Sequence, residues 1–170
     1  LTLIGNEARP MANKIIEVGL TPVEEYYGSE VMLHYPGLYA GSTDLICLHN
    51  DMETVVDFKQ SNRPKKEEWI EDYYLQISAY AMAHDYVYGS KIEQGVIMVC
   101  TPDLYYQEFK VEGLELRKYK HKFLKRLDMY NELKNDEKER AKVDPNKLLK
   151  EFERDTQNDP FKGTSMEGKD

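Results

Sequence analysis

Cysteine and long apolar runs are the features that this sequence lacks most clearly. Only Cys47 and Cys100 occur among 170 residues, so the chain cannot by itself hold a four-cysteine iron–sulfur cluster. We expect both to be buried free thiols in a reducing compartment. The longest apolar stretches are far shorter than the roughly 20 residues that a membrane span needs. The first residues lack the basic and apolar regions of a signal peptide, although the start at Leu1 leaves room for an upstream segment.

Net positive charge is also lacking. The net charge is −8, which by itself argues against a polyanionic partner. The distribution of charge modifies this conclusion, because the segment 117–126 contains no acid and carries Arg117, Lys118, Lys120, Lys122, Lys125 and Arg126. On a helix most of these residues form one broad stripe, opposite an apolar face that begins at Leu116 and ends at Leu127. Because neighbouring like charges on a helix repel, we expect a polyanion to contact this stripe. A solvated helix exterior is the alternative.

Hydrophobic periodicity and turn residues predict the order of the structural elements. The predicted elements are a helix over 7–18, strands over 29–35, 38–48 and 53–59, a helix over 67–88 that ends at Gly89, strands over 92–100 and 104–111, and a helix over 114–134. This order predicts an α/β domain with a mixed central β-sheet flanked by helices. We assign this domain to residues 1–135. Residues 136–170 are predicted to form a charged helical or flexible extension, because much of that segment has little apolar surface to bury.

Asp44, Asp57 and Lys59 are the candidates for a catalytic centre. Asp57 and Lys59 are two positions apart on a strand and therefore share a face, while Phe58 points to the other side. The hairpin between the second and third strands can bring Asp44 next to Asp57. Two carboxylates at one point repel, and a divalent cation relieves this repulsion. Hard oxygen ligands favour Mg²⁺ or Mn²⁺. The alternative is a surface salt bridge on a hairpin.

Three further polar residues could complete this centre. Glu30 lies on the preceding predicted strand and could aim its carboxylate at the same point, or it could simply be solvated. Gln76 and Tyr80 are four positions apart and lie on one face of the long helix. A glutamine amide both donates and accepts hydrogen bonds, so it can hold a phosphate or a water molecule. An ordinary helix face is the alternative.

Three motifs occur in one order along the chain: Gly41-Ser42-Thr43-Asp44, Asp57-Phe58-Lys59 and Gln76-Ile77-Ser78-Ala79-Tyr80. In this G-x-x-D, D-x-K and Q-x-x-x-Y order, the chain resembles the PD-(D/E)XK nuclease superfamily over about residues 10–130. Within that superfamily it is similar to the RecB-like exonuclease branch, with its mitochondrial genome-maintenance and phage exonucleases. The resemblance implies a restriction-endonuclease-like core.

The resemblance also implies a role for each motif residue. Asp44, Asp57 and the backbone carbonyl of Phe58 would bind metal, and Lys59 would position or activate the attacking water. Gln76 and Tyr80 would shape the site and hold the DNA backbone. Glu30 would be the acidic residue often found on the strand before G-x-x-D.

One feature of the branch is missing from the sequence. Many RecB-like nucleases carry a histidine ligand on the first helix, and no histidine occurs near Asn13. This leaves open whether one or two Mg²⁺ or Mn²⁺ ions bind. Relatives that use a four-cysteine cluster are set aside.

We therefore expect a magnesium- or manganese-dependent deoxyribonuclease, namely an exonuclease that acts on single-stranded DNA ends in recombination, repair or phage DNA metabolism. The helices before Glu30 and after Asp57 could form an arch that admits only a free end. The candidates for contact with nucleic acid are Arg63, Lys65, Lys66, Lys118, Lys122, Lys125 and Arg126. The alternatives are a structure-specific endonuclease of the same chemistry and a catalytically inactive nucleic-acid-binding module.

The remaining expectations concern location and partners. We expect the protein to act in the cytoplasm, either of its own cell or, for a phage protein, of the host. We expect no membrane partner, and the sequence leaves open whether a helicase or recombinase partner exists.

Overall fold

The computed structural model describes residues 3–141. Leu1–Leu127 form one compact unit, and a second unit begins at Asp128. The predicted boundary at 135/136 remains a prediction, and most of the predicted extension at 136–170 lies outside the described residues. None of the described helices is long and apolar enough to cross a membrane.

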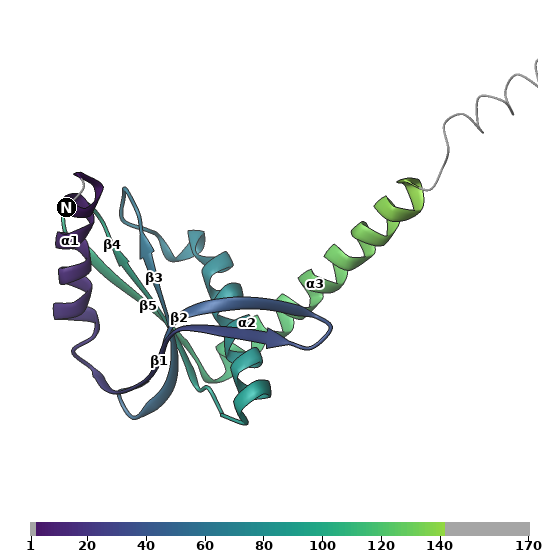
Figure 1. Ribbon diagram of the computed structural model, residues 1–170, viewed down its shortest axis with the longest axis horizontal. Coiled ribbons are helices and arrows are strands. Elements are labelled where there is room, and N and C mark those ends of the chain that lie inside the picture. The colour runs from purple at the N-terminus through teal and green to yellow at the C-terminus, as the bar shows by residue number, and fades with distance from the viewer. Residues whose placement is uncertain (1–2, 142–170) are drawn as a thin grey trace, which may run out of the picture. The chain divides into compact units, whose positions relative to one another are not determined.

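The chain forms a five-stranded sheet with helices on both faces (Figure 1). The elements are α1 (Leu3–Lys14), a π-helical turn η1 (Ile15–Gly19), β1 (Val23–Tyr35), β2 (Tyr39–His49), β3 (Met52–Gln60), a 3-10 turn η2 (Glu67–Trp69), α2 (Glu71–Tyr88), β4 (Gln94–Cys100), β5 (Tyr106–Glu112) and α3 (Gly113–Ala141). The strand order is β1-β2-β3-β4-β5. Only β3 and β4 pair in parallel, across the α2 connection, and the other neighbours are antiparallel. The predicted α/β fold with a mixed sheet is therefore confirmed.

Turn residues end the elements where the sequence predicted. Asn50 and Asp51 both have positive φ values, 50° and 60°, which suit the tight hairpin between β2 and β3. Gly37 has φ 73° in the turn between β1 and β2, and Gly89 has φ 65° at the end of α2. The Gly89 N–H donates to the Asp85 carbonyl at 3.0 Å, which caps the helix.

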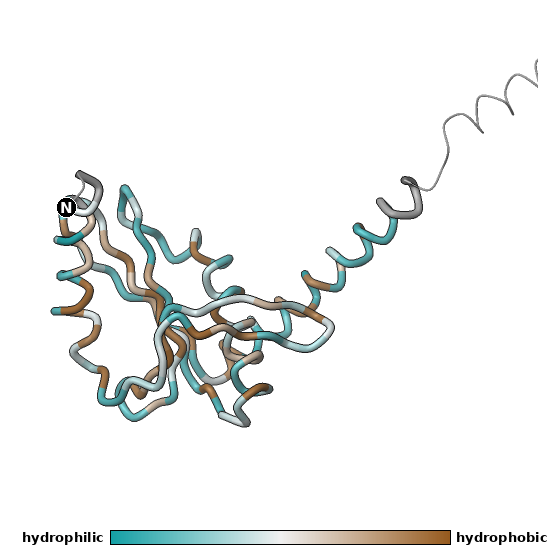
Figure 2. The backbone as a smooth tube through the Cα atoms, viewed as in Figure 1, coloured by the Kyte–Doolittle hydropathy of each residue, from teal (hydrophilic) through white to brown (hydrophobic). Residues whose placement is uncertain are grey.

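Each face of the sheet has its own apolar core. Figure 2 shows hydrophobic residues, in brown, gathered where the strands of the sheet run close together. On one face Val55 packs with Ile77 of α2 and Leu116 of α3. On the other face Val56 and its neighbours pack against Ile15 and the segment that follows α1. Alternation along β3 therefore buries successive side chains in different cores, as period two requires. Every residue of β4 is buried, because this strand is covered on both sides.

The strands β2 and β3 separate near Asp44. Their pairing starts at the hairpin and ends with Leu45 opposite Val56, whereas β1 and β2 stay paired as far as Tyr35 and Tyr39. The far part of the β1–β2 hairpin thus leaves the sheet, as Figure 1 shows. It packs on α2 instead, where the Tyr39 hydroxyl donates to the Ala79 carbonyl at 2.9 Å. This separation opens the end of β3 that carries Asp57.

Two details of the first segment differ from the sequence prediction. The predicted helix over 7–18 is α1 followed by η1, and β1 starts earlier than predicted. The helical spacing of Met11, Ile15 and Val18 predicts one packed face for all three, but Val18 is 41% exposed. The change from α to π winding at Ile15 rotates the later side chains off that face, which periodicity alone cannot predict.

Cys47 and Cys100 are both free and buried. Burial raises the pKa of Cys47 to about 11 and also raises the pKa of Cys100. Neither thiol is therefore an activated nucleophile. Their burial confirms this part of the prediction.

Candidate active site

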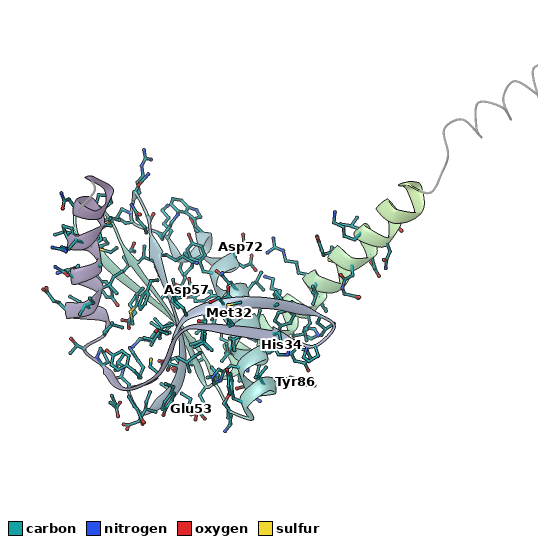
Figure 3. All side chains as sticks on the ribbon, in the orientation of Figure 1. Met32, His34, Glu53, Asp57, Asp72 and Tyr86 are labelled. Atoms are coloured by element: carbon teal, nitrogen blue, oxygen red, sulfur yellow. The ribbon has the colours of Figure 1, made fainter. Side chains whose placement is uncertain are left out.

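Asp57 and Lys59 lie on the α2 face of β3. Val55, two positions earlier, packs with α2 residues, while Phe58 packs in the opposite core. Lys59 Nζ lies 2.7 Å from Asp57 Oδ2. The two residues therefore share a face, as the strand spacing predicted, and they form an ion pair there (Figure 3 labels Asp57).

Asp57 is an unusually buried carboxylate. It is only 5% exposed, and apart from the Lys59 ammonium at 2.7 Å its Oδ2 has no hydrogen-bond partner among the described residues. Burial raises the pKa of Asp57, the Lys59 ammonium lowers it and the nearby Asp44 carboxylate raises it, with a net upward shift. A buried charge that is only partly compensated is typical of a functional site.

Asp44 is placed by the separation of β2 and β3. Its Oδ2 accepts a hydrogen bond of 2.7 Å from the backbone N–H of Phe58. This N–H lies beyond the last β2–β3 pair, so the carboxylate takes the place of the missing strand partner. The bond fixes Asp44 beside Asp57, close enough for its charge to raise the Asp57 pKa.

Lys59 starts a chain of polar contacts that runs along α2. Its Nζ donates to Gln76 Oε1 at 3.1 Å, and Gln76 Nε2 donates to the Tyr80 hydroxyl at 2.8 Å. The same ammonium lies 5.3 Å from the ring centroid of Tyr73, within reach of a cation–π interaction. The structure thus brings Asp44, Asp57, Lys59, Gln76 and Tyr80 together.

Gly41 explains how the first motif meets the third. A Cβ atom at this position would lie 2.7 Å from Cε1 of Tyr80, closer than real Cβ atoms approach. The glycine of G-x-x-D is therefore needed for space rather than for backbone freedom, because its φ is not positive. A hollow of about 410 Å³ lies beside Gln76 and Tyr80, and Arg126 also lines it.

The residues fit a cation that keeps most of its own water. Asp44 and Asp57 offer carboxylate oxygens, and the buried Asp57 Oδ2 has no partner among the described residues other than the Lys59 ammonium. Within residues 3–141, no group of three or more His, Cys, Asp or Glu side chains could hold a metal ion by itself. Mg²⁺ typically binds through one or two carboxylates together with water and substrate phosphates. The donor set therefore suits Mg²⁺ or Mn²⁺ and does not suit an ion enclosed by protein ligands alone.

Glu30 is not brought into this group. The register places it between Ser29, which pairs with Leu45, and Val31, which pairs with Thr43, so it lies opposite Asp44. Its backbone has φ 49°, however, and its side chain is exposed. The left-handed conformation interrupts the regular alternation of side chains, which explains why register alone does not aim this carboxylate at Asp44.

No protein-family model matches the sequence, and no curated protein matches it. Solved structures do match. A protein from Eubacterium rectale that is named as a candidate exonuclease superposes with a TM-score of 0.57 at 14% identity, over 85% of this chain and 57% of that one. The fold is restriction-endonuclease-like. The alkaline exonuclease LHK-Exo from Laribacter hongkongensis matches at 16% identity and a TM-score of 0.36, over 79% of this chain and 71% of that one. At this TM-score the second superposition does not establish a shared fold.

The chain spans only 57% of the length of the Eubacterium rectale protein. The likeness, at this identity, supports the fold alone. The predicted core is thus confirmed, while metal binding by Asp44, Asp57 and the Phe58 carbonyl remains a prediction.

The basic loop, residues 61–66, follows β3 directly and lies next to the site. Lys65 is held through its backbone, because its N–H donates to Gln107 Oε1 at 2.7 Å and its carbonyl accepts from Gln107 Nε2 at 2.9 Å. Arg63 is exposed, and Lys66 Nζ lies 3.8 Å from Glu68 Oε1. The loop therefore presents its cations from a fixed backbone.

The basic stripe of α3 is partly neutralised within the molecule. Lys122 pairs with Glu71 and Arg126 pairs with Asp72, both from the first turn of α2. Lys120 also pairs with Asp85 of α2, at 3.1 Å. The argument that repulsion among these cations calls for a polyanion is therefore wrong for three of them, because acids far away in the sequence neutralise them. Lys118 and Lys125 are exposed, with no ion pair among the described residues.

Sequence reasoning missed three features of this region. The contact of Tyr73 with Lys59 and the packing of Gly41 against Tyr80 depend on how α2 crosses the sheet. The third is Trp69, which is 59% exposed beside the basic loop. The only signal in the sequence was its position between that loop and α2.

A larger hollow, of about 600 Å³, lies at the other end of the sheet around Met52 and Glu112. It contains none of the predicted catalytic residues.

Proposed function

We propose that this chain is a magnesium- or manganese-dependent deoxyribonuclease of the RecB-like branch of the PD-(D/E)XK nucleases. One observation carries the proposal: the buried Asp57 carboxylate is ion-paired with Lys59 and stands beside Asp44 at the point where β2 and β3 separate. An ordinary surface salt bridge would not bury a carboxylate to this degree. The three motifs, in their order, and the restriction-endonuclease-like fold support the same proposal.

The reaction is hydrolysis of a phosphodiester bond. A water oxygen forms a bond to phosphorus, the bond from phosphorus to the 3′ oxygen breaks, and that oxygen leaves with a proton. When bound, the divalent cation supplies the Lewis acidity that activates water and neutralises phosphate charge. Asp44 and Asp57 would hold it.

The remaining residues act on the phosphate and the attacking water. Lys59 is 24% exposed, so its ammonium can reach solvent and substrate from the floor of the site. It is oriented by Asp57 and by Gln76 Oε1, and it can stabilise the negative charge that grows on the phosphate oxygens. Tyr80 orients the Gln76 amide in turn. Such orientation lowers the barrier because the charged donor does not need to reorganise.

The preferred substrate is proposed to be a single-stranded DNA end. Contact with a phosphate backbone is supported by the basic loop at Arg63 and Lys65 and by Lys118 and Lys125, which form no ion pair among the described residues. The predicted arch of helices is wrong, because Ile15, just after α1, packs on the sheet face opposite to Asp57. The requirement for an end therefore rests on the family resemblance and needs a direct test.

The test uses end-labelled linear single strands and covalently closed single-stranded circles, each with Mg²⁺, Mn²⁺ or EDTA. We expect linear strands to be degraded with either metal, circles to persist and EDTA to stop the reaction. Rapid nicking of circles would establish an endonuclease instead. Binding of DNA without any metal-dependent cleavage would establish a catalytically inactive module.

Matched variants connect this activity to the site. Asp57→Ala and Lys59→Ala should each abolish cleavage, while circular dichroism shows a folded protein. Asp51→Asn is the control, because it removes one carboxylate from an exposed hairpin turn and should cleave like the wild type. Normal turnover by a folded Asp57 or Lys59 variant would refute the assignment of the site.

A further inference from the structure

Next to the end of β3 is a hollow that the proposed chemistry does not use. Its volume is about 600 Å³, and its walls are Gln60, Ser61, Asn62, Arg63, Lys65 and Trp69, together with one proline. Gln60 directly follows Lys59 in the chain, so the hollow begins one residue beyond the proposed catalytic lysine. The hollow therefore adjoins the end of the strand that carries Lys59.

The walls of this hollow suit a nucleotide. Its charged residues are the cations Arg63 and Lys65, although the chain as a whole has a net charge of −8. The rest of its polar lining includes the side-chain amides of Gln60 and Asn62, which can donate to phosphate or base oxygens. Glu67 and Glu68 are close in sequence but do not line it. The hollow thus combines positive charge with neutral hydrogen-bond donors.

Trp69 forms one wall of the hollow. It is 59% exposed, and an indole ring left largely in water gains free energy when another flat surface covers it. Lys66 Nζ lies 5.1 Å from the ring centroid but does not line the hollow. The ring is therefore held beside the cavity with a further positive charge against it.

The backbone that carries these side chains is fixed. The Ser61 hydroxyl donates to the Arg63 carbonyl at 2.6 Å, and Gln107 clamps both the N–H and the carbonyl of Lys65. The backbone N–H of Trp69 donates to the Lys66 carbonyl at 2.9 Å. These bonds use backbone groups and leave the basic and aromatic side chains available, so binding a ligand need not order the loop.

We propose that this hollow binds an unpaired nucleotide of single-stranded DNA, with its base stacked on Trp69 and its phosphate contacted by Arg63 and Lys65. This proposal rests on the proposed nuclease function, which is the reason to expect a DNA strand at this place. It adds a structural basis for specificity toward unpaired DNA. Aromatic rings stack on any unpaired base, whereas the bases of intact duplex are already stacked.

The test exploits the fact that Trp69 is the only tryptophan of the chain. Its fluorescence is titrated with a short oligothymidylate and with a blunt duplex, using Ca²⁺ in place of Mg²⁺ to hold back cleavage. We expect saturable quenching by the single strand and much weaker quenching by the duplex. Trp69→Ala should weaken binding of the single strand by about fivefold to a hundredfold, followed by fluorescence anisotropy of a labelled strand.

Two further variants separate stacking from charge. Trp69→Ala should leave the slope of log affinity against log salt unchanged, whereas Arg63→Gln should reduce it by about 0.7. Tyr88→Ala is the matched control, because Tyr88 is also 59% exposed but is the last residue of α2, and it should bind like the wild type. Trp69→Phe should recover part of the lost affinity.

Wild-type affinity in a folded Trp69→Ala protein would overturn the proposal. Unchanged fluorescence of the wild-type protein at saturating single strand would also overturn it, and this second measurement decides even if the alanine variant does not fold. If the wild type shows these binding effects but no metal-dependent cleavage, the nuclease proposal fails and the nucleotide site stands. If it cleaves DNA but Trp69→Ala binds normally, only the nucleotide site fails.

Discussion

Replacing Asp57 by Asn should stabilise the protein in the absence of metal and remove its response to metal. Burial raises the pKa of Asp57 despite the attraction of Lys59. For an acid with a raised pKa in the folded state, protonation favours folding, so stability is lower at neutral pH and is recovered as the pH falls through the raised value toward the ordinary value of 3.8. Asn removes the charge, and Lys59 keeps its bond to Gln76 Oε1.

The magnitude follows from linkage. Each unit by which the fold raises the pKa of a carboxyl group lowers the folding stability of its ionised form by about 1.4 kcal/mol. A cation that binds only the folded protein stabilises it by about 1.4 kcal/mol at ten times its Kd. For a unit the size of Leu1–Leu127, each kcal/mol raises Tm by about 3 to 5 °C. Saturating the wild type to this level should therefore raise its Tm by about 4 to 7 °C.

The assay is thermal unfolding of the wild type, Asp57→Asn and Asp51→Asn without metal and over a series of Mg²⁺ and Mn²⁺ concentrations. Asp57→Asn should start at a higher Tm than the wild type and stay there as metal is added. Asp51→Asn removes the same charge from an exposed turn and should follow the wild type. A metal-induced rise in Asp57→Asn equal to that of the wild type would refute metal binding by Asp57. A lower starting Tm would show that the Lys59 ion pair outweighs the cost of burial.

Three other changes test separate parts of the structure. Gly41→Ala places a methyl group against the ring of Tyr80, which should lower kcat by about tenfold to a hundredfold in a cleavage assay with a stability cost of about 1 to 3 kcal/mol. Burial lowers the pKa of His49 from its ordinary value of 6.5. Wild-type stability should therefore fall below that pH by up to about 1.4 kcal/mol per pH unit, and His49→Gln should flatten this dependence in urea unfolding. Lys118→Gln combined with Lys125→Gln removes two exposed cations that have no ion pair among the described residues, and it should reduce the salt slope of single-strand binding by about 1.4, measured by anisotropy in Ca²⁺.

Each of these changes has its own control. Ser42→Ala alters an exposed neighbour of Gly41 and should retain activity; loss of activity in both variants would show that the hairpin, not the Tyr80 contact, is sensitive. An unaltered acid profile in His49→Gln would contradict the role given to its buried ring. Glu71→Gln with Asp72→Asn frees the paired cations of α3 and should tighten DNA binding. An unchanged salt slope in the variant that lacks Lys118 and Lys125 would show that DNA passes elsewhere.

Local patterns in the sequence were enough for the elements and for the pairing of residues within one element. Alternation along β3 correctly placed Asp57 and Lys59 on one face with Phe58 on the other, because the period of a strand does not depend on its neighbours. Spacing of four along α2 correctly put Gln76 beside Tyr80. The turn residues Asn50 and Gly89 took the positive φ values that their types favour.

Tertiary structure decided which of these local faces meet. The separation of β2 from β3 at Leu45 and Val56 leaves the Phe58 N–H without a strand partner, and only that loss makes Asp44 its acceptor. Glu30, opposite Asp44 in the register, is exposed and has a left-handed backbone that no spacing rule predicts.

Charge shows the same division between sequence and fold. The stripe of cations on α3 was visible in the sequence. The acids that form ion pairs with Lys122 and Arg126, however, come from α2, more than 50 positions away. Sequence alone determined the residue types and the period of each element, because these depend on neighbours along the chain. The fold decided burial, pairing and the height of the Asp57 pKa, because desolvation and Coulomb interactions depend on distance in space.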